Sequence, residues 1–152
     1  MHYYFRFYTA LCCFTALLTG CSGGEGTRTY EVTGTVQWDG QPVAGSSVFF
    51  VPMEDDGKTI SSSVPMAFGA TDEQGIYRLT VPGNSIGSGA AVGSYKVTVK
   101  KGPSVDGPIN DPSKVSLIPY VYAEAATTPL KADVTTDKSK NVFNFTLEGK
   151  AP

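Results

Sequence analysis

The side chains best suited to covalent chemistry gather at the start of this 152-residue chain. The three cysteines are Cys12, Cys13 and Cys21, and the single histidine is His2. A cysteine thiolate is a strong nucleophile, and imidazole is the usual general base near neutral pH. From residue 22 onward the sequence has neither group. That part of the chain therefore cannot build a Ser–His or Cys–His catalytic pair.

Cys21 follows a short apolar segment. Residues 7–18 carry no charge, and Arg6 precedes them. A membrane-spanning helix needs about 20 apolar residues, so this segment is too short, whereas its length and flanks are typical of a secretory signal peptide. The order Leu18-Thr19-Gly20-Cys21 resembles the lipobox of bacterial lipoproteins, which implies cleavage before Cys21 and a diacylglycerol on its sulfur. An ordinary signal peptide cleaved at a small-residue site is the alternative.

This resemblance divides the chain into three parts. We expect a signal peptide over residues 1–20, a flexible tether over 21–29 and one folded domain over 30–149. Cleavage removes Cys12, Cys13 and His2, and lipid uses the last thiol, which leaves no disulfide and no cysteine metal site. Two or more acyl chains hold a protein on a membrane, because each buried methylene contributes about 0.8 kcal/mol. The location implied is the bacterial cell envelope, and Ser22 favours the outer over the inner membrane.

Composition and hydropathy pattern indicate an all-β domain. The net charge is −2 and the charges are scattered, so no basic stripe for nucleic acid is present. Asp39-Gly40 predicts a hairpin turn, and Asp72 begins a second turn in which its carboxylate bonds locally. We expect a roughly seven-stranded immunoglobulin-like or prealbumin-like β-sandwich. Alternating apolar and polar residues predict strands at 30–38, 43–51, 66–71, 76–81, 94–100, 130–135 and 142–147.

Two motifs also resemble a known family. The run from Gly34-Thr-Val36 through Asp39-Gly40-Gln-Pro42 to Val48-Phe-Phe50 looks like the opening of bacterial carboxypeptidase regulatory-like domains. Thr71-Asp72-Glu-Gln-Gly75-Ile-Tyr77 is similar to their second hallmark. The resemblance covers roughly Val32 to Leu147 and implies a seven-stranded sandwich of the prealbumin (transthyretin) type. Members of this family are mostly non-catalytic modules, so the resemblance implies that the chain is not an enzyme.

Three aromatic side chains are candidates for contact with a ligand. Trp38 precedes the first hairpin turn, and Tyr120 and Tyr122 follow a proline-containing stretch. Such rings could stack on sugars. Packing in or beside the core is the competing interpretation and the more frequent fate of aromatic residues.

Calcium is the one metal that the sequence suggests. Asp55, Asp56 and Asp72 could supply carboxylates if their loops share one end of the sandwich. The spacing is not that of an EF-hand, and solvated, turn-forming acids are the simpler interpretation. We expect no other metal and no cofactor.

The resulting hypothesis is a non-catalytic, lipid-anchored module of the envelope whose partner is a protein or a glycan. The alternative is a carbohydrate- or calcium-binding accessory domain, and the missing imidazole and thiol groups disfavour a hydrolase. An exposed sheet edge could also accept a peptide strand, with Lys96, Lys100 and Lys101 protecting that edge.

Overall fold

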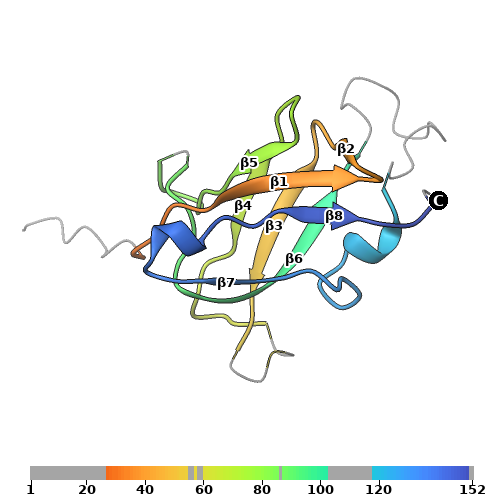
Figure 1. Cartoon of the computed structure of the whole chain (residues 1–152). Coiled ribbons are helices and arrows are strands. Elements are labelled where there is room, and N and C mark those ends of the chain that lie inside the picture. The colour runs from red at the N-terminus through yellow and green to blue at the C-terminus, as the bar shows by residue number, and fades with distance from the viewer. Residues whose placement is uncertain (1–26, 55–56, 58–59, 86, 103–117, 151–152) are drawn as a thin grey trace, which may run out of the picture.

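A computed structural model describes residues 27–54, 57, 60–85, 87–102 and 118–150. Within these residues the chain forms two β-sheets that pack face to face, so the predicted all-β sandwich is confirmed (Figure 1). The elements are β1 (Thr33–Trp38), β2 (Gln41–Pro42), β3 (Ser47–Pro52), β4 (Ala67–Ala70), β5 (Ile76–Arg78), β6 (Gly93–Lys100), β7 (Lys131–Val134) and β8 (Phe145–Leu147), with the 3-10 helices η2 (Tyr120–Tyr122) and η3 (Lys138–Lys140).

The first sheet is built around β1. Strand β1 pairs antiparallel with β2 and β5 and parallel with β8. The second sheet has the order β4-β3-β6-β7 and is antiparallel throughout. Strand β7 pairs with β6 from Gly93 to Lys96, so the expectation that Lys96 protects an edge is wrong. The two sheets join between β4 and β5, where Phe68 and Thr80 exchange backbone hydrogen bonds of 2.9 and 2.8 Å.

The predicted hairpin at Asp39-Gly40 is confirmed. Both residues have positive φ angles, 48° and 78°, as the tight turn between paired strands requires. The strand that returns from this turn is the two-residue β2, and the predicted strand from Val43 begins only at Ser47. The reason is a corner held by Thr71. Its hydroxyl donates to the Val43 carbonyl (2.6 Å) and accepts from the Ser46 amide (2.8 Å), which sends the chain from one sheet to the other.

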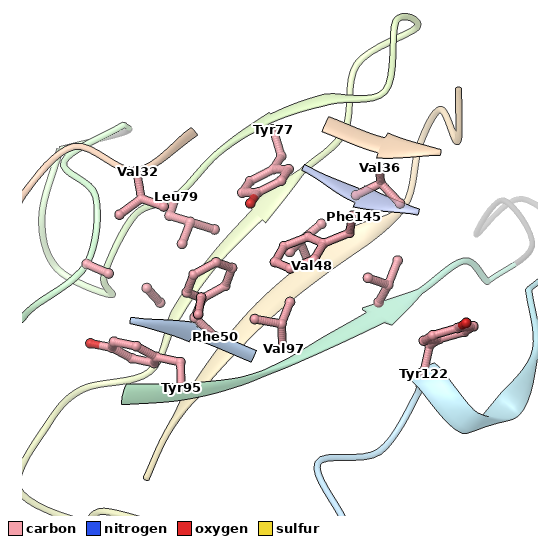
Figure 2. Close-up of a cluster of buried hydrophobic side chains, with 14 of the residues drawn as sticks. Val32, Val36, Val48, Phe50, Tyr77, Leu79, Tyr95, Val97, Tyr122 and Phe145 are labelled. Carbon is pink, nitrogen blue, oxygen red and sulfur yellow. The ribbon is translucent and has the colours of Figure 1, made fainter. Parts of the chain in front are cut away.

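The core fills the space between the sheets. Figure 2 shows Phe50 among Tyr77, Tyr95 and Phe145, and the Phe50 ring centroid lies 5.6–6.2 Å from theirs. All four side chains are at least nine-tenths buried. Burying a large apolar side chain stabilises the folded state by about 1.5–3 kcal/mol, so this cluster is a main source of the stability of the sandwich.

Each buried tyrosine hydroxyl in this cluster has a backbone partner. Tyr77 donates to the Phe143 carbonyl and Tyr95 donates to the Ala91 carbonyl, both at 2.8 Å. The Tyr77 hydroxyl reaches Phe143 by passing over Gly34, where a Cβ would overlap the Phe143 carbonyl oxygen. Burial raises the pKa of Tyr95 to about 12 and raises that of Tyr77 still further, because the phenolate would lose its hydration.

Two asparagine side chains take the place of backbone partners. The buried Asn141 amide donates to the Thr135 carbonyl (2.8 Å) and accepts from the Thr135 amide (2.9 Å), just beyond the end of β7. The Asn144 side chain accepts from the Thr35 amide at 3.0 Å, beside the paired part of β8. In both places the side chain satisfies backbone groups that a strand would otherwise satisfy.

Candidate functional site

The three aromatic candidates lie at one end of the sandwich. Trp38 ends β1, and its indole N–H donates to the Gly149 carbonyl at 2.9 Å. The Tyr122 hydroxyl accepts from the Glu148 amide (2.9 Å) and donates to the Glu148 carbonyl (3.3 Å). Both therefore hold the segment that follows β8. Figure 1 shows η2 beside the ends of β1 and β8, opposite the end at which the described chain begins. We call Trp38, Tyr120, Val121 and Tyr122 the aromatic end.

The members of the aromatic end differ in exposure. Tyr122 is buried and Trp38 is half-buried against the core. Tyr120 is 67% exposed, and its neighbour Val121 is 42% exposed. Only Tyr120 therefore presents most of its ring to solvent, whereas Trp38 and Tyr122 use their polar atoms to fix the backbone around it.

The short helix η2 holds Tyr120 in a defined position. Pro119 precedes it in an extended conformation, and its carbonyl accepts from the Tyr122 amide at 3.2 Å. The Thr127 hydroxyl donates to the Val121 carbonyl at 2.9 Å. An aromatic ring on a turn tied down in this way loses little conformational entropy on binding, which favours it as an anchor for a partner.

Charged residues border the aromatic end. Glu124 follows η2, and one of its carboxylate oxygens lies 3.5 Å from the Lys100 ammonium at the end of β6. Both side chains are exposed, so the pair contributes at most about 1 kcal/mol to stability. The pair places both signs of charge beside the aromatic end, an arrangement typical of the polar rim of a binding surface.

The carboxylates proposed for calcium do not form a described site. Asp55 and Asp56 lie outside the described residues. One carboxylate oxygen of Asp72 accepts from the Gln74 amide (3.0 Å) and the Ile76 amide (2.8 Å), which confirms its local role in the turn. Glu54 follows the C-terminal end of β3. Asp72 lies near the other end of that strand, because it follows Ala70, which pairs with Ser47. Among the described residues, no three His, Cys, Asp or Glu side chains are grouped so that they could hold a metal ion.

Cys21 also lies outside the described residues, together with the rest of residues 1–26. The chain enters the domain at Tyr30, whose backbone exchanges hydrogen bonds of 2.8 and 3.0 Å with Ala90. This bridge fixes the point at which the expected tether would leave. In the part of the chain that the structure covers, no helix is long and apolar enough to cross a membrane.

Val121 and a second exposed group of apolar residues are not among the candidates that the sequence pattern predicts. Phe49 and Phe68 are cross-strand partners on the outer face of the second sheet, with ring centroids 6.5 Å apart. The alternation of buried and partly exposed residues along β3 is the signal that places Phe49 outward, because Val48 and Phe50 point into the core.

No family model, no curated protein and no solved structure matches this chain. The resemblances to bacterial lipoproteins and to carboxypeptidase regulatory-like domains therefore stay predictions.

Proposed function

We propose that this chain is a non-catalytic, lipid-anchored binding or structural module of the bacterial cell envelope. Cys21 carries the lipid, and the partner is an envelope protein or a glycan that contacts the aromatic end. The sequence Leu18-Thr19-Gly20-Cys21 supports the anchor, and the presentation of Tyr120 supports the binding role.

The single observation that supports the binding role is the exposed ring of Tyr120 on η2, a short helix that hydrogen bonds hold in place. Tyr30 and Trp38 stand at opposite ends of an extended segment that includes β1, which spans about 26 Å at 3.3 Å per residue. The start of the described chain and η2 thus lie at opposite ends of the domain (Figure 1). A partner bound at Tyr120 therefore avoids the anchored end.

The roles of the polar side chains support a non-catalytic module. The hydroxyls of Tyr77, Tyr95 and Tyr122 all donate to backbone carbonyls. The Asp72 carboxylate accepts from two amides of its own turn. These groups thereby stabilise the fold, and none of them forms a nucleophile–base pair of the kind that acyl transfer requires.

A carbohydrate-binding module is the second candidate, and the exposure of Tyr120 favours it. The face of an aromatic ring stacks on the C–H groups of a sugar, and the Lys100–Glu124 pair beside η2 offers donors and acceptors for hydroxyl groups. This candidate shares the binding surface with the first and differs only in the partner.

The anchor is tested by mass spectrometry of the protein extracted from the membranes of its own host. We expect an N-terminal peptide that begins at Cys21 and carries acyl chains, and we expect the Cys21→Ser variant to leave the membrane fraction. An unmodified chain that keeps its first residues would overturn the proposal.

The binding role is tested by a photo-crosslinking amino acid placed at Tyr120. We expect one envelope protein or glycan species to be captured in cells. The matched control is the same probe at Val142, which is also exposed but lies outside the aromatic end. Equal capture from both positions, or no capture at Tyr120, would contradict a binding role for η2.

A further inference from the structure

The outer face of the second sheet is divided into an apolar half and a basic half. The strand registers place Phe49 opposite Phe68, and Val51 opposite Lys96, which in turn faces Lys131. Lys100 lies at the far end of β6, opposite Ser47. The apolar members are on β3 and β4, and the lysines are on β6 and β7. We call this set the amphipathic face: Phe49, Val51, Phe68, Lys96, Lys100 and Lys131.

The apolar half is accessible to a partner. Phe68 is 39% exposed, and Phe49 and Val51 are partly exposed. On the outer face of the first sheet, β1 presents Thr33, Thr35 and Gln37, and the exposed apolar side chains there are aliphatic: Ile76 opposite Thr35 and Val142 opposite Thr33. Among the described residues, the second sheet is therefore distinguished by an aromatic pair that lies beside lysines on its outer face.

The basic half has an excess of positive charge. Lys96 and Lys131 are directly opposed across β6 and β7, an arrangement that is unfavourable unless something else compensates for it. The Lys96 ammonium donates to the Thr128 carbonyl at 3.0 Å. Two carboxylates lie nearby. Asp133 accepts from the Ser94 hydroxyl (2.7 Å), and Glu124 pairs with Lys100.

The net charge of the amphipathic face thus differs in sign from that of the whole chain. Three lysines outnumber two nearby carboxylates in a chain whose net charge is −2. A negatively charged protein is repelled by an anionic surface unless it turns a basic face toward that surface. The lysines would select the orientation, and the neighbouring phenylalanine rings would add apolar contact.

We propose that the amphipathic face rests on the anionic surface of the membrane that holds the chain. Phe49 and Phe68 lie at the boundary of the acyl chains, and the lysines meet lipid phosphate groups. This inference rests on the proposed lipid anchor. It adds a second, non-covalent contact with the bilayer, and it gives the domain a defined side that faces the membrane.

The length of chain between the anchor and the domain allows this contact. A glycine-rich linker of eight residues, the length from Ser22 to Thr29, has an expected reach of about 14–17 Å. The radius of gyration of a domain of this size is about 14 Å. The tether therefore keeps the domain close to the bilayer, where a high effective concentration makes a weak surface contact sufficient.

Charge favours a membrane over a second copy of the chain as the occupant. Two amphipathic faces packed with their apolar halves in contact would also place lysines of one copy near lysines of the other, which is unfavourable. Lipid phosphates supply the opposite charge, and acyl chains supply the apolar partner. An acidic, apolar protein segment would satisfy the same face, and the experiment below separates it from lipid.

The test uses the full chain, acylated in a bacterial host and reconstituted into vesicles of phosphatidylcholine with or without phosphatidylglycerol. Processing leaves no unmodified cysteine, so a single fluorophore can be attached to Ala70→Cys on the outer end of β4. The matched control is Ile76→Cys on β5 of the first sheet. Both positions are exposed. We expect lipids with spin-labelled headgroups to quench the label at residue 70, but not at 76, and only when phosphatidylglycerol is present.

Two variants sharpen the test. Lys131→Gln should weaken the surface-bound orientation about fivefold. Phe68→Ser should reduce quenching at residue 70 without changing its salt dependence. Thermal unfolding and circular dichroism check that each variant is folded.

The outcomes distinguish this inference from the proposed function. A chain that is acylated and floats with the vesicles, yet shows equal quenching at 70 and 76, overturns the membrane-facing side alone. A chain that carries no acyl group overturns the anchor, and this inference falls with it. A photo-crosslinker at Phe68 that captures a protein and not lipid in native envelopes also contradicts the inference.

Discussion

Aromatic residues serve two different purposes in this protein. In the interior, Phe50, Tyr77 and Tyr95 pack ring against ring, and both hydroxyls bond to backbone carbonyls. At the surface, Tyr120 on η2 and Phe68 on β4 present their rings to solvent. The interior group therefore determines stability, and the surface group is free to serve binding. Changes in the two groups should affect different measurements.

The largest effect on stability is expected for Phe50→Ala. The Phe50 ring lies within 6.2 Å of four other aromatic rings and is fully buried, so its removal leaves a cavity that the two sheets cannot close. The expected loss in the free energy of unfolding is about 3–5 kcal/mol. Urea unfolding followed by circular dichroism measures it. Phe68→Ala is the matched control, and an equal loss there would erase the distinction between the two groups.

Gly34→Ala should be nearly as harmful although it adds only one methyl group. The new Cβ would overlap the Phe143 carbonyl oxygen and crowd the Tyr77 hydroxyl, so the segment leading into β8 must move. Overpacking of this kind costs about 1–3 kcal/mol. The same urea experiment measures it. Gly40→Ala, where a Cβ meets nothing within 4 Å, separates crowding from the strain of a positive φ angle.

The buried tyrosines should make the protein less stable in strong alkali. Their pKa values are higher in the folded than in the unfolded chain, where tyrosine titrates near 10. Above pH 10 the unfolded state therefore binds fewer protons than the folded state, and stability falls as the pH rises toward 12. Melting temperatures measured from pH 8 to 12 test this expectation.

Tyr95→Phe serves as the control for the alkaline effect. It removes one hydrogen bond, at a cost of about 1 kcal/mol at neutral pH. It also removes one titrating group, so its melting temperature should fall less steeply above pH 10 than that of the unmodified chain. A parallel fall in both proteins would show that the Tyr95 phenol is not the cause.

The smallest effect on stability is expected for Tyr120→Ala. A mostly exposed side chain contributes within about 0.5 kcal/mol, so the melting temperature should hardly change. Capture of the partner should be lost. Tyr122→Phe is the reverse case, because it breaks the bonds to Glu148 and leaves the exposed ring of Tyr120 in place. A large loss of stability in Tyr120→Ala would show that the Tyr120 ring stabilises the fold, and would contradict its assignment to the surface group.

The features that could be predicted from the sequence are those that depend on neighbours along the chain. Asp39-Gly40 makes its turn from its own two φ angles, and Asp72 bonds to amides within four residues. Alternation alone placed Val48 and Phe50 in the core. These local signals were enough to predict the all-β sandwich.

The features that could not be predicted depend on contacts between distant residues. The corner after Val43 requires the Thr71 hydroxyl, and the position of Trp38 depends on the Gly149 carbonyl. Tyr120 and Tyr122 are the same residue type and lie two positions apart, so the sequence does not distinguish their exposure. Only the placement of Glu148 makes one of them buried and bonded while the other is exposed.

The amide of Asn141 has a consequence for the outer edge of the second sheet. The unpaired backbone groups of an edge strand are a template on which another strand can pair. Asn141 occupies both backbone groups of Thr135, one residue past β7. A strand added to the edge at β7 therefore could not continue its pairing to Thr135, which limits the length of the ladder that another chain could form there.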